Sequence, residues 1–193
     1  MLPQTKTEMT SEQYLAAERI SEVKHEFFDG AIFAMAGASK THNLISSNLV
    51  RIIGNALLNK PCSVYASDMR VKSEGANKYC YPDVVATCQD EKFEDEKEDT
   101  LLNPLLIIEI LSDSTEGYDR GDKFFHYRQI GSFVEYILIS QKNSHVERYI
   151  RQPDNTWLYC EFKSIDDHIE LSSIDATIEL KDIYHKVKIN TDR

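Results

Sequence analysis

A single glutamate interrupts an otherwise apolar run, and this run restricts the fold more than any other part of the chain. The run is Leu105-Leu106-Ile107-Ile108-Glu109-Ile110-Leu111. Apolar residues on both faces are typical of a strand inside a sheet that is covered on its two sides. An ionised carboxylate in such a strand costs several kcal/mol unless something pairs with it. We therefore expect Glu109 to have a partner, and a metal ion is one candidate.

A second carboxylate lies at the start of another apolar strand, in Tyr81-Pro82-Asp83-Val84-Val85-Ala86. Side chains alternate along a strand, so if the two strands pair, Asp83 and Glu109 can reach one point at a sheet edge. Downstream, Asp119, Lys123 and Tyr127 are spaced four residues apart, which places them on one face of a helix. Folding this helix back over the strand would bring Lys123 toward both acids.

Two carboxylates and a lysine have a chemistry in common. Carboxylate oxygens are the hard ligands that Mg²⁺ prefers. A bound metal polarises a phosphodiester oxygen and lowers the pKa of a water molecule, while a nearby lysine stabilises developing negative charge. The three residue types therefore indicate a metal-dependent phosphodiesterase.

The order of predicted elements indicates an α/β fold, a mixed sheet flanked by helices. The longest helix follows from apolar residues at helical spacing, and the first hairpin from an Asp-Gly turn at Asp29-Gly30. Helices are predicted at 11–18, 41–59 and 118–129. Strands are predicted at 25–35 (the hairpin), 63–66, 69–72, 81–88, 105–111 and 134–139, as outer antiparallel strands at 145–150 and 157–162, and near Ile169 and Ile178.

Composition excludes some classes of protein. A length of 193 residues predicts one domain, 1–193, and a hydrophobic fraction of 41% is enough for a packed core. The net charge of −10 argues against a protein that coats nucleic acid, although it does not exclude a nuclease. The acidic run 90–99 is expected to be a solvated loop. No stretch reaches the roughly 20 apolar residues of a membrane span, and residues 1–12 are too polar for a signal peptide.

The four cysteines, Cys62, Cys80, Cys88 and Cys160, contain no C-x-x-C pair. A zinc or redox motif is therefore not indicated. We expect free, buried or half-buried thiols in a reducing compartment, and a cytoplasmic protein.

Taken together, these motifs resemble the Uma family of bacterial restriction-endonuclease-like proteins, in the PD-(D/E)XK nuclease superfamily. The resemblance rests on Tyr81-Pro82-Asp83, on Glu109-Ile110-Leu111-Ser112-Asp113-Ser114-Thr115, and on Asp119-Arg120-Gly121-Asp122-Lys123-Phe124 with Tyr127. It continues upstream in 26–30, 34–39, His42-Asn43 and 67–71, and covers residues 10–185, which we expect to form the ordered core.

The resemblance implies a restriction-endonuclease-like core and hydrolysis of DNA with Mg²⁺, for which Mn²⁺ is a substitute. Asp83 and Glu109 correspond to the two acidic motif residues, and Glu26 resembles a further metal ligand. The usual lysine of the superfamily would fall at Leu111, so the resemblance points to Lys123 on the following helix instead. A homodimer is expected, because two symmetric sites suit the two strands of a duplex.

Structural roles compete with these catalytic ones. Glu109 could form an ion pair with Lys123 or Arg120, and Lys123 could pair with Asp119. Asp119 could orient Lys123, and Tyr127 could be a packing residue with a polar tip.

His42 could contact a phosphate, help to orient Glu26, or make a structural hydrogen bond. At the level of function, the alternative is a catalytically inactive nuclease-fold protein that acts as a DNA-binding or protein-interaction module. Hydrolysis of RNA or of a nucleotide would use the same residues as hydrolysis of DNA.

Overall fold

A six-stranded mixed sheet lies at the centre of the computed structural model, which describes residues 5–6, 9–88 and 90–189. We call it the central sheet. Its strands, in spatial order, are β12 (Trp157–Phe162), β11 (Val146–Arg151), β10 (Glu135–Ser140), β9 (Leu106–Leu111), β7 (Val84–Cys88) and β4 (Cys62–Ala66). Neighbouring strands are antiparallel except β9 and β10, which are parallel. Every residue of β9 is buried, as the apolar run predicted.

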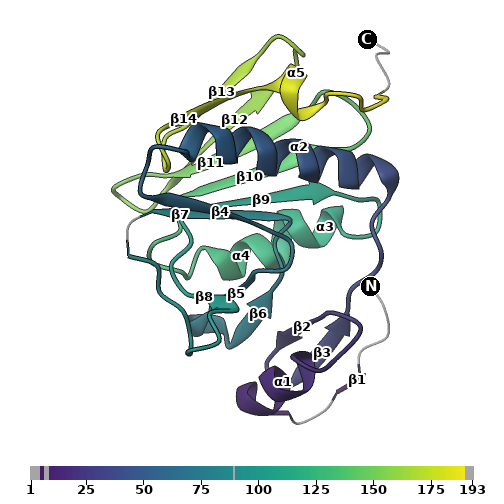
Figure 1. Cartoon of the computed structure of the whole chain (residues 1–193), viewed down its shortest axis with the longest axis vertical. Helices are drawn as coiled ribbons and strands as arrows, with labels where there is room; N and C mark the ends of the chain where they lie inside the picture. Colours follow the sequence, from purple (N-terminus) through teal and green to yellow (C-terminus); the bar gives the residue numbers. More distant parts are fainter. Residues whose placement is uncertain (1–4, 7–8, 89, 190–193) are drawn as a thin grey trace.

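Helix α2 (Lys40–Leu57) covers one face of the central sheet (Figure 1). The Ser39 hydroxyl accepts the His42 N–H and caps its first turn, and Ile45, Leu49 and Ile53 are fully buried at helical spacing. The hairpin of β13 (His168–Leu171) and β14 (Ala176–Glu179), followed by α5 (Leu180–Ile183), packs beside α2 on the same face of the central sheet. The predicted long helix and the two strand-like pieces are confirmed, whereas α5 was not predicted.

A helical segment lies on the other face of the central sheet. It consists of α3 (Glu116–Tyr118), a π-helical turn η2 (Asp119–Lys123) and α4 (Phe124–Tyr127). The sequence predicted one regular helix over 118–129, so the wider π turn is a correction. The π turn contains two of the predicted site residues, Asp119 and Lys123, and π turns of this kind are common at functional sites.

A second sheet packs beyond this helical segment. In spatial order its strands are β1 (Thr5–Lys6), β3 (Ala31–Ala34), β2 (His25–Phe28), β6 (Lys78–Cys80), β5 (Arg70–Ser73) and β8 (Thr100–Leu101). A 3-10 turn, Glu74–Ala76, joins β5 to β6. Asp29 and Gly30 both have positive φ in the hairpin turn, as Asp-Gly predicted. Helix α1 (Ser11–Glu18), with the predicted cap at Thr10, packs through Tyr14 onto the outer face of this sheet.

The acidic run 90–99 forms ion pairs with two arginines, which corrects the expectation of a purely solvated loop. We call Asp95 and Asp99 with these arginines the clamp. Asp95 and Asp99 both bind Arg19, which follows α1, with N–O distances of 2.7 and 2.8 Å. Asp99 also lies 2.5 Å from the buried Arg70 guanidinium. The run therefore ties α1 to the second sheet through ion pairs that composition alone could not reveal.

Replacing Asp99 with asparagine should lower the free energy of unfolding by about 2 kcal/mol, because Arg70 would keep its buried charge without a carboxylate. Hydrogen bonds from Arg19, together with Arg70, hold the pKa of Asp99 below its ordinary value. This contribution is therefore present above the unfolded-state pKa of about 4 and is lost as the pH falls through the folded-state pKa. Urea unfolding of both proteins at pH 7 measures the effect, and an unchanged midpoint would show that the clamp is energetically neutral.

Two of the four cysteines are joined, which contradicts the expectation of free thiols for them. Cys62 and Cys88 lie opposite each other on β4 and β7 and form a disulfide, with Cα atoms 3.9 Å apart. Cys80 and Cys160 are free, as predicted. The pairing depends on strand register, which cysteine spacing does not encode. Among the described residues, no helix is long and apolar enough to cross a membrane.

Candidate active site

The strand that follows Asp83 and the strand that carries Glu109 pair as expected. β7 runs antiparallel to β9, with Val84 opposite Ile108, so the same register brings Asp83 beside the Glu109–Ile110 peptide. The Asp83 Oδ2 atom accepts the Ile110 N–H at 2.7 Å. Its Oδ1 atom lies 3.1 Å from His42 Nε2, which α2 supplies from the opposite side. The carboxylate of Asp83 is therefore fixed between the end of a strand and the first turn of a helix.

Glu109 has an ammonium and a phenol as partners. Lys123 Nζ lies 2.9 Å from Glu109 Oε1, and the Tyr127 hydroxyl donates to the same oxygen at 3.0 Å. All three side chains are buried, Glu109 with 2% and Lys123 with 6% of its surface exposed. Both partners come from the helical segment that follows β9, which is the folding back that the sequence predicted.

Glu26 approaches the same lysine from the second sheet. Its Oε1 atom lies 3.2 Å from Lys123 Nζ and accepts the Tyr81 N–H at 3.4 Å. Its Oε2 atom accepts the Tyr118 hydroxyl at 3.1 Å. The neighbouring His25 faces away from it and binds Glu18 instead, with His25 Nδ1 and Glu18 Oε2 separated by 3.0 Å. Lys123 therefore bridges acids from two different sheets.

Asp119 completes the surroundings of the lysine. Its Oδ1 atom lies 3.8 Å from Lys123 Nζ, one turn away, and only 4% of Asp119 is exposed. The Tyr136 hydroxyl of β10 donates to the Asp119 carbonyl at 3.0 Å, which anchors the π turn to the central sheet. Three buried carboxylates thus surround one ammonium, an excess of negative charge inside the protein.

Burial and charge act strongly on this cluster. Burial raises the pKa of the Glu109 carboxyl well above its ordinary value, with Lys123 opposing the rise and Asp119 and Asp83 adding to it. Burial also raises the pKa of Asp119. Burial acts to lower the pKa of Lys123, but the charges of Glu109, Glu26 and Asp119 outweigh it and hold that pKa well above its ordinary value. Perturbation of several neighbouring groups in this way is typical of functional sites.

The structure brings the predicted residues together in two groups. In the first group, Lys123 forms ion pairs with Glu26, Glu109 and Asp119, and the Tyr127 hydroxyl donates a hydrogen bond to Glu109. The pair of His42 and Asp83 joins this group through the backbone of β9, so His42 contacts Asp83 rather than Glu26. Glu109 pairs with Lys123 and not with Arg120, which binds Glu116 at 3.0 Å. As these side chains stand, no three His, Cys, Asp or Glu residues in the described part of the chain are grouped closely enough to hold a metal ion.

The sequence did not reveal Tyr118 and Tyr81 as partners of Glu26. Tyr118 reaches Glu26 from α3, and Tyr81 reaches it from the residue after β6, a strand that was not predicted. The signal was present in the alternation of residues 78–81, where Lys78 and Cys80 share one face and Tyr79 and Tyr81 the other. The face of β6 that carries Cys80 turns toward the helical segment, since Cys80 packs in the same core as Tyr127.

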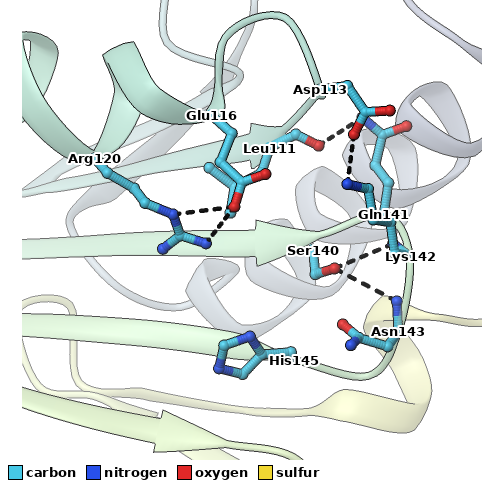
Figure 2. A pocket seen from close by; sticks show the side chains of 9 residues that line it. All are labelled: Leu111, Asp113, Glu116, Arg120, Ser140, Gln141, Lys142, Asn143 and His145. Carbon is cyan, nitrogen blue, oxygen red and sulfur yellow. Dashed lines mark hydrogen bonds and ion pairs between the residues drawn. The ribbon is translucent and has the colours of Figure 1, made fainter.

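A polar pocket of about 170 Å³ lies beyond the ends of β9 and β10 (Figure 2). It is lined by none of the predicted site residues. Its basic side chains face acids, because Lys142 Nζ lies 2.5 Å from Asp113 and Arg120 binds Glu116. We therefore place the candidate site at the buried carboxylates, where charge is unbalanced, rather than in this pocket.

Comparison with known proteins identifies relatives that match most of the chain. Two uncharacterised proteins of Synechocystis sp. are similar along most of their length. One, slr1290, is 35% identical over 91% of each chain, and the other, sll1609, is 37% identical over 85% of this chain and 93% of its own. A crystal structure from Anabaena variabilis, described as a "putative nuclease belonging to DUF820", has the same fold, with a TM-score of 0.75 and 18% identity over 91% of this chain and 97% of its own.

The family model that matches this chain spans residues 11–181 and is described as "Putative restriction endonuclease". This range contains all seven predicted site residues and both sheets except β1. The fold is accordingly restriction-endonuclease-like, a mixed α/β arrangement with helices on the faces of the sheets. The chain belongs to the Uma2 family.

Proposed function

We propose that this protein is a metal-dependent endonuclease of the PD-(D/E)XK type that hydrolyses phosphodiester bonds in DNA. Membership of a family described as "Putative restriction endonuclease" supports a nuclease in general. The observation that carries the proposal further is the bridging position of Lys123 between Glu26 and Glu109, the second of which lies on the strand that pairs with β7. Acids from separate strands and one buried lysine are the groups that such a hydrolysis requires.

The donor set suits Mg²⁺ or Mn²⁺. Asp83, Glu109 and Glu26 offer only carboxylate oxygens, which hard divalent cations prefer, and the cluster around Lys123 has more carboxylates than ammonium groups. Asp83 and Glu109 would hold the ion, with Glu26 as a further ligand. Bound there, a divalent cation would polarise a phosphate oxygen and make a water molecule more acidic.

The protein's own groups would position the reacting atoms. Lys123, an ammonium among three carboxylates, stays protonated, so it acts as a hydrogen-bond donor to developing negative charge and not as a base. The Tyr127 and Tyr118 hydroxyls orient Glu109 and Glu26, and His42 orients Asp83. These roles make Tyr127, Tyr118 and His42 positioning residues.

The direct test is cleavage of DNA by the purified protein. Supercoiled plasmid and linear duplex are incubated with Mg²⁺, with Mn²⁺ and with EDTA. We expect nicking or cutting with either metal and none with EDTA. Intact DNA under all metal conditions would contradict the proposed function, and equal cutting of RNA would change the substrate.

A second candidate is a nuclease-fold protein that binds DNA or another protein without turnover. The observation that favours it is that Lys123 already forms ion pairs with Glu26 and Glu109, at the place where a metal would be needed. Calorimetric titration with Mn²⁺ separates the two candidates. The endonuclease requires binding that is lost in Glu109→Gln, whereas a module without turnover needs no binding at all.

Two further proposals accompany the endonuclease. A homodimer would offer one site to each strand of a duplex, and sedimentation of the protein with and without DNA tests it. A cytoplasmic location also stays a proposal. Thiol titration of protein extracted under alkylating conditions would show whether Cys62 and Cys88 are joined in the cell.

Cleavage should increase as the pH rises from weakly acidic values. Glu109 must be ionised to bind a cation, and its pKa lies above the ordinary 4.5 because of burial. At low pH the carboxyl retains its proton and the metal affinity falls. The rate of DNA cleavage at fixed Mg²⁺ should therefore have an acid limb whose midpoint lies above 4.5. A rate that is already constant at pH 5 would contradict this assignment.

A further inference from the structure

Strand β12 is the outermost strand of the central sheet, so only one of its two edges is paired, with β11. The N–H and C=O groups of successive residues in a strand point to opposite edges. Arg151, the partner of Trp157 in the β11–β12 pair, donates its N–H to Val134 on the β10 side at 2.8 Å. Trp157, Tyr159 and Glu161 therefore direct their backbone groups away from the sheet, along the unpaired edge.

We call the outward N–H and C=O groups of these three residues the free edge. In the described part of the chain, no other segment forms backbone hydrogen bonds with them. The free edge ends at Lys163, because its N–H donates to the Asp167 carboxylate at 3.0 Å and its C=O accepts the Ser144 hydroxyl at 2.8 Å. An edge with unpaired backbone groups is a template for a further strand.

Exposed apolar side chains lie along the free edge. Leu158 is 50% exposed and Tyr159 44%, and Ile165, in the turn after β12, is 39% exposed. The one acid of β12, Glu161, pairs with Lys163 at 2.5 Å. The edge thus has no net charge, on a chain whose net charge is −10. Two copies of this chain would repel each other less here than at an acidic surface.

The opposite edge of the central sheet, at β4, differs in both respects. Asp90, Glu91 and Glu98 line an open hollow with the first residues of β4, together with one lysine, Lys60. In β4, which the structure describes in full, no large apolar side chain is exposed. Two copies that met at β4 would bring like charges together, which opposes association. A second copy therefore fits β12 better than β4.

A two-fold axis at Tyr159 would satisfy the whole free edge. In two antiparallel copies of β12, Tyr159 then lies opposite Tyr159 of the second copy, and every outward N–H and C=O gains a partner. On the same face, Trp157 lies opposite Glu161 of the second copy, an indole N–H beside a carboxylate. On the other face, Leu158 lies opposite Cys160 of the second copy. No like charges face each other directly in this register.

We propose that two copies of this chain dimerise through β12, so that their central sheets join into one continuous antiparallel sheet at this point. The inference goes beyond the proposed function, because it requires neither a metal ion nor DNA. It assigns a surface to the homodimer. Backbone hydrogen bonds provide the attraction, and the apolar side chains that flank them provide the specificity.

The test is the mass of the protein in EDTA without DNA, measured by light scattering during gel filtration over a series of concentrations. The wild type should have twice the chain mass of 22.2 kDa. Leu158→Lys should raise the dissociation constant of the dimer at least roughly tenfold, because a charged side chain would lie in the apolar contact. Leu58→Lys is the matched control, since Leu58 is 77% exposed at the end of α2, and it should keep the wild-type mass.

Tyr159→Pro tests the backbone pairing itself. Its N–H points outward, so proline removes a bond to the second copy and none to β11. This variant should weaken the dimer as Leu158→Lys does, while its circular dichroism spectrum stays that of the wild type.

A disulfide tests the register. In Leu158→Cys the introduced thiol would lie opposite Cys160 of the second copy, and Cys160 is free and half-buried. Diamide, which takes up one hydrogen from each of two thiols, should join them, and peptide mapping should identify this crosslink. Leu58→Cys should not crosslink to Cys160.

The outcomes separate this inference from the endonuclease. A wild type that is monomeric throughout the series would contradict both the β12 interface and the homodimer, and would leave the proposed cleavage untouched. A dimer that survives both Leu158→Lys and Tyr159→Pro would show that the copies meet elsewhere and that the inference is wrong. Failure to cleave DNA would contradict the endonuclease and not the interface.

Discussion

An Asp83→Asn variant is expected to cleave DNA at least about a thousand-fold more slowly than the wild type and to keep its fold. The amide retains an oxygen that can accept the Ile110 N–H, so the local hydrogen bond survives. The charge that would hold a divalent cation is lost. A thousand-fold loss corresponds to about 4 kcal/mol of transition-state stabilisation, a reasonable share for a metal that polarises the phosphate.

The measurement is single-turnover cleavage of a duplex in Mg²⁺, with thermal unfolding as a check on the fold. Asp113→Asn is the matched control, because Asp113 is exposed and pairs only with Lys142 in the pocket of Figure 2. This control should cut at the wild-type rate. An Asp83→Asn variant that still cut would reject the assignment of the site.

A Lys123→Met variant should lose both activity and stability. Removing the ammonium leaves Glu26 and Glu109 buried without their shared cation, a change that typically costs about 3–5 kcal/mol. Cleavage should fall by roughly a hundred-fold or more, since in the proposed mechanism this amine donates to the negative charge that develops on the phosphate. Urea unfolding and single-turnover kinetics measure the two effects separately.

Mg²⁺ should partly restore the stability of Lys123→Met. A divalent cation can replace the missing ammonium among the carboxylates, so millimolar Mg²⁺ should raise the melting temperature of this variant more than that of the wild type. Adding Glu109→Gln to the variant should remove the response, because the charge that attracts the ion is reduced. A melting temperature that is insensitive to Mg²⁺ would indicate a purely structural ion pair.

The spatial arrangement of these residues was predictable where a local rule applied. Glu109 stood out because a charge in an apolar strand needs a partner, and the pairing of its strand with β7, which follows Asp83, was expected from the two apolar runs. The position of Lys123 near Glu109 followed from the expectation that the helix after the Glu109 strand folds back over that strand. The π turn changes the geometry of that helix, but it leaves Asp119 and Lys123 on the buried side.

The remainder depends on contacts between segments that are distant in the sequence. The disulfide of Cys62 with Cys88 requires the register of β4 on β7, and the clamp formed by Asp99 requires α1 to fold over the second sheet. The contact of Tyr118 with Glu26 requires α3 to lie against β2, although the two residues are 92 positions apart in the sequence. In each case the chemistry was visible in the sequence and the partner was not.

The most direct test of the account is a crystal soaked in Mn²⁺ and measured at a wavelength where manganese scatters anomalously. We predict one anomalous peak that is bonded by carboxylate oxygens of both Asp83 and Glu109, with the Lys123 ammonium beside it. If the Asp83 and Glu109 carboxylates keep their present positions and no anomalous peak lies between them at saturating Mn²⁺, the metal-dependent mechanism is contradicted.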